Sequence, residues 1–167
     1  MREDDALWAQ VAARNAEAFE KLYHNHYPRV RGFLRIYLGN APAVDDVTQD
    51  TFLQLWQRPQ GFDPSRSTLK AYLFGIARKK AADWWRHQRP AESPPGEIAS
   101  ESRGSTLPLK DAFERLAPES RNVLWLREVE GYSYDELARI LDVPLGTVKS
   151  RLFSAREELR RVWKTGE

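Results

Sequence analysis

The stretch Ser133–Phe153 reads SYDELARILDVPLGTVKSRLF and decides the fold of the C-terminal part of the chain. Ser133 followed by Glu136 is the pattern of a capping box, which starts a helix. Asp142 stands where the chain must turn, and Asp tolerates a positive φ better than most residues. Pro144 prevents the first helix from continuing. The order of these signals predicts a helix, a tight turn and a second helix, which together form a helix-turn-helix.

The second of these helices has two chemically different faces. Val148, Leu152, Ala155 and Leu159 recur on one side and are expected to face the core. The other side carries Lys149, Ser150, Phe153 and Ser154, with Arg151 and Arg156 on its flanks. A solvent-facing ring on a basic helix suits a helix that enters the major groove of DNA, where apolar groups meet thymine methyls and polar groups reach base edges. The alternative is a helical hairpin whose charges are only solvated.

Composition excludes several classes of protein. The chain has 167 residues, 30% of them charged, and it contains no Cys. Disulfides and thiolate metal sites are therefore excluded. The N-terminus lacks an apolar signal core, and no apolar run approaches the length needed to cross a membrane. We therefore expect a cytoplasmic protein without membrane insertion. The net charge of +2 is too small to indicate nucleic acid, so the distribution of charge matters more.

The N-terminal part is expected to be helical. Apolar residues spaced from Leu7 to Leu22 predict one amphipathic helix, and Pro28 is expected to open another that ends near Gly39. His24 and His26 would diverge on a helix and have no further ligand placed by the sequence, so no metal site is predicted there.

The next predicted helix, Val44–Gln57, combines acidic and aromatic residues. Its core seam consists of Val44, Val47, Thr51 and Leu55, and the other side carries Asp45, Asp46, Gln49, Asp50, Phe52, Leu53 and Trp56. Exposed rings among carboxylates are typical of a surface that docks a basic protein partner. Two alternatives stay open. The face is simply a solvated acidic one, or Asp46 and Asp50, one turn apart, share a metal or act as an acid/base pair.

A loop and a basic helix follow. Pro and Gly mark Arg58–Ser67 as a loop, and a helix is predicted for Thr68–His87. The basic residues around this helix are Arg66, Lys70, Arg78, Lys79, Lys80, Arg86 and Arg89, and the nearby rings are Phe62, Tyr72, Phe74, Trp84 and Trp85. Cations and aromatic faces together suit single-stranded or opened nucleic acid. The alternative, favoured for Tyr72 and Trp84, is that the rings belong to the core.

The stretch Pro90–Pro108 is dominated by Pro, Ser, Gly and Glu and is predicted to be a flexible linker. Short helices are expected after it, the last of them ending at Gly131, before the helix-turn-helix. The sequence therefore predicts an all-α protein with two small helical domains, residues 1–90 and 109–167, joined by the linker 91–108.

Six stretches, in this order, resemble one protein family. They are Asp45–Trp56 (DDVTQDTFLQLW), Phe62–Arg66 (FDPSR), Ala71–Arg78 (AYLFGIAR), Arg121–Arg127 (RNVLWLR), Glu130–Tyr134 (EGYSY) and Gly146–Leu152 (GTVKSRL). Together they are similar to the bacterial RNA polymerase sigma factors of the extracytoplasmic-function type, also called group IV. The resemblance covers both predicted domains, which would correspond to sigma regions two and four.

The resemblance implies a set of partners and contacts. Core RNA polymerase would be bound through its β′ clamp helices and β flap, with docking residues Asp45, Asp46, Gln49, Asp50, Phe52 and Trp56. The −10 promoter DNA would be bound by Phe62, Ser65, Arg66, Lys70, Arg78, Lys79 and Arg86. The −35 element would be read by Thr147, Lys149, Ser150, Arg151, Phe153 and Ser154. An anti-sigma factor and a role in a stress response are also implied, with no catalysis and no cofactor. The rival interpretation is a helix-turn-helix regulator that binds duplex operator without polymerase.

Overall fold

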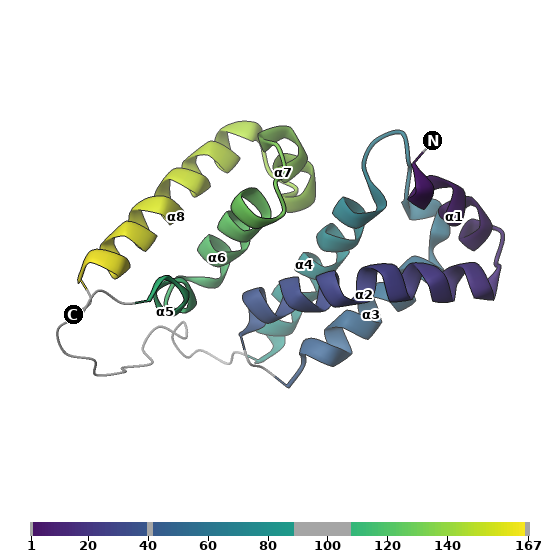
Figure 1. The fold of residues 1–167 in the computed structure, drawn as a ribbon, viewed down its shortest axis with the longest axis horizontal. Helices are drawn as coiled ribbons and strands as arrows, with labels where there is room; N and C mark the ends of the chain where they lie inside the picture. Colours follow the sequence, from purple (N-terminus) through teal and green to yellow (C-terminus); the bar gives the residue numbers. More distant parts are fainter. Residues whose placement is uncertain (1, 40–41, 89–107, 166–167) are drawn as a thin grey trace. The chain divides into compact units, whose positions relative to one another are not determined.

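The computed structural model describes residues 2–39, 42–88 and 108–165, and its regular elements within these ranges are all helical. The chain divides into two compact units, Met1–Arg86 and His87–Glu167. The first contains α1 (Glu3–Ala12), α2 (Ala16–Leu38), α3 (Val44–Gln57), the short 3-10 helix η1 (Pro59–Gly61) and α4 (Leu69–Gln88). The second contains α5 (Leu109–Glu114), α6 (Pro118–Leu124), the π-helical η2 (Trp125–Val129), α7 (Tyr134–Leu141) and α8 (Leu145–Thr165) (Figure 1). The all-α prediction is confirmed. The predicted linker, residues 91–108, lies outside the described residues except for Pro108.

The structure corrects the first predicted helix. It is interrupted at Arg14, which has a left-handed φ of 67°. Asn15 then caps α2, because its side-chain oxygen accepts the backbone N–H of Ala18 at 3.0 Å. The apolar spacing from Leu7 to Leu22 therefore belongs to two helices. The side chain of Asn15 can bond the backbone at the start of a new helix, which is a local alternative to continuing α1.

The second helix is also longer than predicted, because Pro28 lies inside α2 and does not begin a helix. A proline in a helix interior costs about 3 kcal/mol, since it removes one hydrogen bond and crowds the preceding turn. Buried side chains on both sides of it, among them Leu22, Val30 and Phe33, offset that cost. Each fully buried apolar side chain contributes about 1.5–3 kcal/mol.

Aromatic contacts hold the first unit together. The helices α2 and α3 lie side by side (Figure 1). The rings of Phe33 and Phe74 join α2 to α4, with centroids 4.9 Å apart. The ring of Phe62 lies 5.2 Å from Trp8 of α1 and 5.2 Å from Tyr72 of α4. The segment between α3 and α4 is therefore fastened to the core at its centre.

The predicted helix-turn-helix is confirmed in the second unit. The hydroxyl of Ser133 accepts the N–H of Glu136 at 3.2 Å, and the carboxylate of Glu136 accepts the N–H of Ser133 at 2.7 Å. Asp142 ends α7 with a φ of 53°. Helix α8, the second helix of the helix-turn-helix, begins at Leu145, and the carbonyl of Pro144 accepts the N–H of Thr147 at 3.0 Å.

The position of α8 is fixed by its buried side and by one carboxylate. Val148, Leu152 and Ala155 are buried, as predicted, whereas Leu159 is only half-buried. Near the other end of the helix, Glu158 accepts the backbone N–H of Ala117 at 2.8 Å and the hydroxyl of Ser120 at 2.6 Å. Because these donors lie at the start of α6, the carboxylate caps that helix and holds α8 against it.

Candidate functional site

The predicted acidic face of α3 is present on the surface of the first unit. Asp45, Asp46, Gln49 and Asp50 are exposed, Trp56 is half-buried and Leu53 is 49% exposed. The other side of the helix is buried. Its two hydroxyls have hydrogen-bond partners, since those of Thr48 and Thr51 donate to the carbonyls one turn earlier. Leu53 was not included among the predicted contacts, although its position between Gln49 and Trp56 on the helix surface was a usable signal. The face therefore offers carboxylates, an amide and an exposed aliphatic group.

Phe52 is a correction. Its ring was expected to be exposed on this face, and it is only 1% exposed. It packs against Tyr23 and Tyr27 of α2, with centroids 4.9 and 6.2 Å away. Phe52 falls at the border between the buried and exposed sides of α3, so the tyrosines of the neighbouring helix decide its burial. The ring supports the face from below and is not part of its surface.

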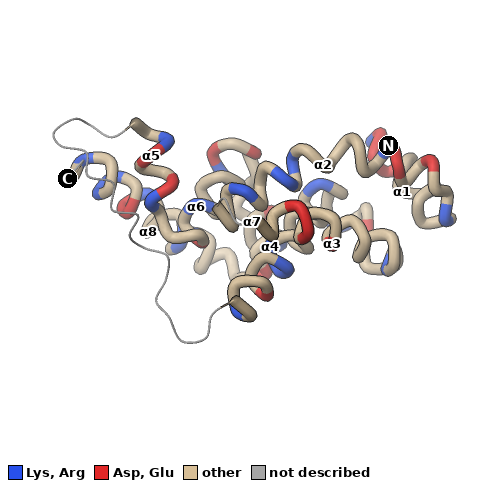
Figure 2. Tube along the Cα trace, turned by 90° about the horizontal axis from the view of Figure 1, so that it is seen from below, with Lys and Arg blue, Asp and Glu red and all other residues tan. Residues whose placement is uncertain are grey.

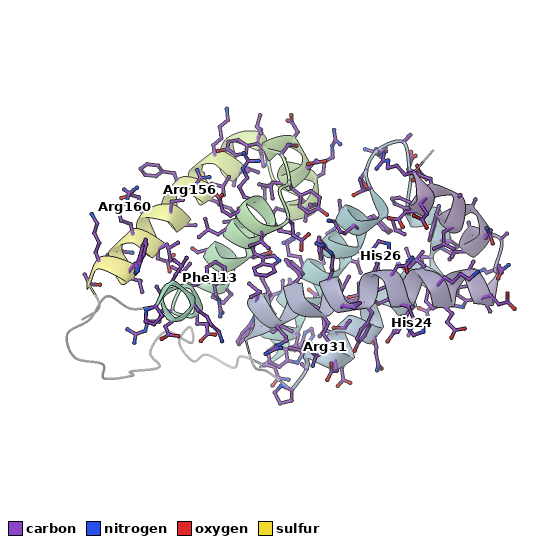
Figure 3. The ribbon with its side chains drawn as sticks, viewed as in Figure 1. His24, His26, Arg31, Phe113, Arg156 and Arg160 are labelled. Carbon is purple, nitrogen blue, oxygen red and sulfur yellow. The ribbon has the colours of Figure 1, made fainter. Side chains whose placement is uncertain are left out.

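Asp45 forms an ion pair within the unit. The Nε of Arg31, on α2, donates to its carboxylate at 2.7 Å (Figure 3). This hydrogen bond lowers the pKa of Asp45, so the group is a carboxylate at neutral pH. Among the described residues no ion pair engages Asp46 or Asp50, which therefore offer more of their charge to a partner. Sequence reasoning missed Arg31, because the packing of α2 on α3 brings it to this face.

Phe62 is a second correction, in the segment predicted to bind −10 DNA. The ring is 5% exposed and contacts Trp8 and Tyr72, so it is not available to a base in this structure. A Cβ on Gly61 would lie 2.4 Å from the hydroxyl of Tyr72, so any other residue at this position would require the tyrosine side chain to shift. Ser65 is exposed, and its N–H and hydroxyl donate to Asp63 at 2.9 and 2.7 Å, which lowers the pKa of Asp63.

The basic residues around α4 remain accessible to different degrees. Arg66, Lys79 and Arg86 are exposed, while Lys70 and Arg78 are partly exposed. Figure 2 shows the charged positions along the chain, with cations on α4. Of the rings, Phe74 is fully buried, whereas Trp84 and Trp85 are half-buried and lie edge-on to each other with centroids 5.1 Å apart. Cations are therefore the main accessible feature of this helix.

Helix α8 has the surface that the sequence predicts. Phe153 is 68% exposed, and Lys149, Ser150, Arg151 and Ser154 are exposed around it. Thr147 is partly exposed, and its carbonyl accepts the hydroxyl of Ser150 at 3.0 Å. The six predicted residues therefore lie together at the start of α8.

Arg156 borders this group at its far end. Its Nη2 donates to the carboxylate of Glu128, in η2, at 2.8 Å, and this hydrogen bond raises the pKa of Arg156 (Figure 3). The ion pair joins α8 to the π-helical η2.

Comparisons with known proteins match both units. The family described as Sigma-70 region 2 matches residues 22–91, and the family described as Sigma-70, region 4 matches residues 106–159. The ECF RNA polymerase sigma factor SigK of Mycolicibacterium vanbaalenii is 32% identical over 94% of this chain and 87% of its own length. The chain belongs to the ECF sigma factors. It is also 32% identical to the sigma factor RpoE of Cereibacter sphaeroides, over 89% of this chain and 87% of that one.

Two solved structures have the same fold. CnrH, in complex with the cytosolic domain of CnrY, has a TM-score of 0.72 and 29% identity, and the match covers 97% of each chain. RpoE of Bartonella quintana, in complex with the anti-sigma factor NepR, has a TM-score of 0.69 and 25% identity, covering 91% of this chain and 100% of that one. As a sigma factor, this protein binds core RNA polymerase and promoter DNA and directs transcription initiation. The operator-binding regulator is not favoured.

Further observations concern a metal site, the two neighbouring histidines and membrane insertion. Within residues 2–39, 42–88 and 108–165, no three His, Cys, Asp or Glu side chains gather as a metal site would require. His26 is buried and lies 3.2 Å from Asp4, while His24 is exposed beside Glu20 (Figure 3). None of the helices in the described parts has the length and apolar character to span a bilayer.

Proposed function

We propose that the exposed face of α3 docks this sigma factor on core RNA polymerase. Asp46, Asp50 and, less strongly, Asp45 supply negative charge, while Leu53 and Trp56 supply apolar area. A surface of this kind fits a basic partner surface, because charge steers the encounter and buried rings and aliphatic groups hold it. The partner would be the β′ clamp helices, and the β flap would meet the second unit.

The segment Arg58–Ser67 and α4 would hold the opened −10 DNA. Arg66, Lys70, Arg78, Lys79 and Arg86 supply the cations, and Ser65 supplies an exposed hydroxyl within the loop. Phe62 would act by anchoring this loop to Trp8 and Tyr72, not by stacking on a base. Base stacking is worth about 1.4 kcal/mol per base-pair step. Contacts with the phosphates and with polymerase therefore have to supply most of the free energy of opening.

A salt titration tests the phosphate role of α4. Replacing Lys79 by Ala should flatten the dependence of log affinity on log salt by about 0.7 for a single-stranded contact, because one fewer counterion is released. The measurement is holoenzyme binding to a promoter with a pre-opened −10 region. Lys21→Ala, an exposed position on α2, is the matched control and should leave the slope unchanged. An unchanged slope for the Lys79 variant would contradict the assignment.

The recognition helix α8 would read the −35 element as duplex DNA. The observation that carries this assignment is the exposure of Phe153, 68%, among cations on the second helix of a helix-turn-helix. Lys149 and Ser150 are placed to reach base edges and phosphates, and the ring to meet a thymine methyl. Thr147, Arg151 and Ser154 border them.

An anti-sigma factor is proposed as the regulator of this protein, in a cytoplasmic stress response. Two structural relatives, RpoE of Bartonella quintana and CnrH, were solved in complexes with NepR and with the cytosolic domain of CnrY. A protein that covers the α3 face or the start of α8 would block the proposed contacts. We also propose that the chain has no catalytic activity of its own.

Reconstituted transcription tests the whole proposal. Purified core polymerase and this chain should together start transcripts at defined positions on fragments of the source genome, and core polymerase alone should not. Sequencing the transcript starts would give the −10 and −35 elements directly. Failure to start at any site, with the chain folded and bound to core polymerase, would contradict the proposed promoter contacts.

A further inference from the structure

We propose that Arg14, in the junction between α1 and α2, is a positioning residue for Trp56 on the polymerase-docking face. The two residues are 42 positions apart in the sequence. The inference rests on the proposed docking function of α3 and adds a residue that neither the resemblance nor the family match assigns. The Sigma-70 region 2 match begins at residue 22, so Arg14 lies outside it.

The backbone at this position is unusual for a residue with a side chain. Arg14 has a φ of 67°, in the left-handed region that Gly adopts readily and other residues disfavour. The turn itself is made by backbone hydrogen bonds, from the N–H of Arg14 to Val11 at 2.9 Å and from the N–H of Asn15 to Gln10 at 3.1 Å. These bonds do not require a side chain. A glycine would satisfy the turn better, so the arginine is expected to serve another purpose.

The side chain of Arg14 reaches the end of the docking helix in two ways. Its Nη1 donates to the backbone carbonyl of Trp56. That carbonyl lies in the last turn of α3, where carbonyls lack helical partners and cations are favoured. The guanidinium carbon also lies 5.4 Å from the centre of the Trp56 ring, within the range of a cation–π contact.

The Trp56 ring has a second neighbour that completes its placement. Phe19, on α2, lies with its centroid 4.9 Å from that of Trp56 and with the rings inclined by 50°. Trp56 is half-buried, so part of the ring is left for a partner, while Arg14 is itself exposed. Arg14 therefore adds a contact to that of Phe19 and limits the rotation of the ring. A ring held in place before binding loses less conformational freedom when a partner covers it.

Replacing Arg14 by Gly tests this role without straining the turn. The Arg14→Gly chain should keep its thermal midpoint or raise it, because Gly suits the left-handed conformation. Its affinity for core RNA polymerase should fall about two- to fivefold, the size of a surface cation–π contact. Ala13→Gly is the matched control, since it loosens the same exposed junction and leaves the guanidinium in place. It should bind core polymerase as the unchanged chain does.

A double-mutant cycle separates positioning from direct contact. In a Trp56→Leu background, Arg14→Gly should have no further effect on polymerase affinity, because the residue acts through the ring. A full additional loss in that background would show that Arg14 touches polymerase itself, and it would overturn the proposal. Equal affinity of the Arg14→Gly and unchanged chains would also overturn it.

The same assay distinguishes failure of this inference from failure of the docking assignment. If Asp50→Lys weakens binding and Arg14→Gly does not, only the role of Arg14 is wrong. If neither variant affects binding, the α3 face is not the docking surface, and the inference falls with it.

Discussion

Replacing Asp50 by Lys is expected to weaken the binding of core RNA polymerase at least about tenfold, which corresponds to about 1.4 kcal/mol. The change converts an attraction towards a basic partner into a repulsion at the centre of the exposed face. The helical content should not change, because Asp50 is exposed and forms no ion pair among the residues that the structure describes. Competition for core polymerase against a labelled sigma factor, with circular dichroism on the same samples, measures both quantities.

The loss should also depend on ionic strength, because screening weakens interactions between exposed charges. Glu20→Lys, an exposed charge reversal on α2, is the matched control and should change polymerase affinity much less. Unaltered affinity of the Asp50 variant at low salt would show that the acidic face is only solvated, which is the alternative that the sequence leaves open.

Replacing Leu152 by Ala is expected to destabilise the second unit by about 2–5 kcal/mol. Leu152 is 1% exposed and lies on the side of α8 that meets the core, so its truncation leaves a cavity. The unit is small, and a loss of this size is a large part of the stability of an ordinary domain. Thermal unfolding of the full chain, followed by circular dichroism, should show part of the helical signal lost at a lower temperature.

The adjacent variant Phe153→Ala provides the contrast. Surface substitutions usually change stability by less than about 0.5 kcal/mol, so this variant should unfold as the unchanged chain does. Its holoenzyme should instead prefer different −35 sequences, which a randomised −35 library would detect. A large loss of thermal stability with the same promoter preference would show that the ring is part of the core.

Local signals predicted the second unit well. The capping box at Ser133, the left-handed Asp142 and the apolar side of α8 all act within a few residues of each other. The exposure of Phe153 followed from helical periodicity alone, because the buried side of α8 lies well away from it. Local signals also predicted the bounds of α3, which the structure reproduces at Val44–Gln57.

Errors arose where a distant element decides the environment of a residue. Phe52 and Phe62 were both expected at a binding surface. Neighbours far away in the sequence bury them, Tyr23 for the first and Trp8 for the second. The prediction that Pro28 begins a helix was wrong for the same reason, since packing on both sides of this residue outweighs its local cost.

The sequence by itself determined that this protein is all-helical, that it belongs with the sigma factors and which face of α8 is exposed. These properties depend on periodicity, caps and motifs, which act over one or two helical turns. Only the tertiary structure decided which rings remain on the proposed docking face and that Arg31 and Arg14 reach it. Those contacts join α3 to α2 and to the α1–α2 junction, and burial of a side chain depends on the elements packed around it.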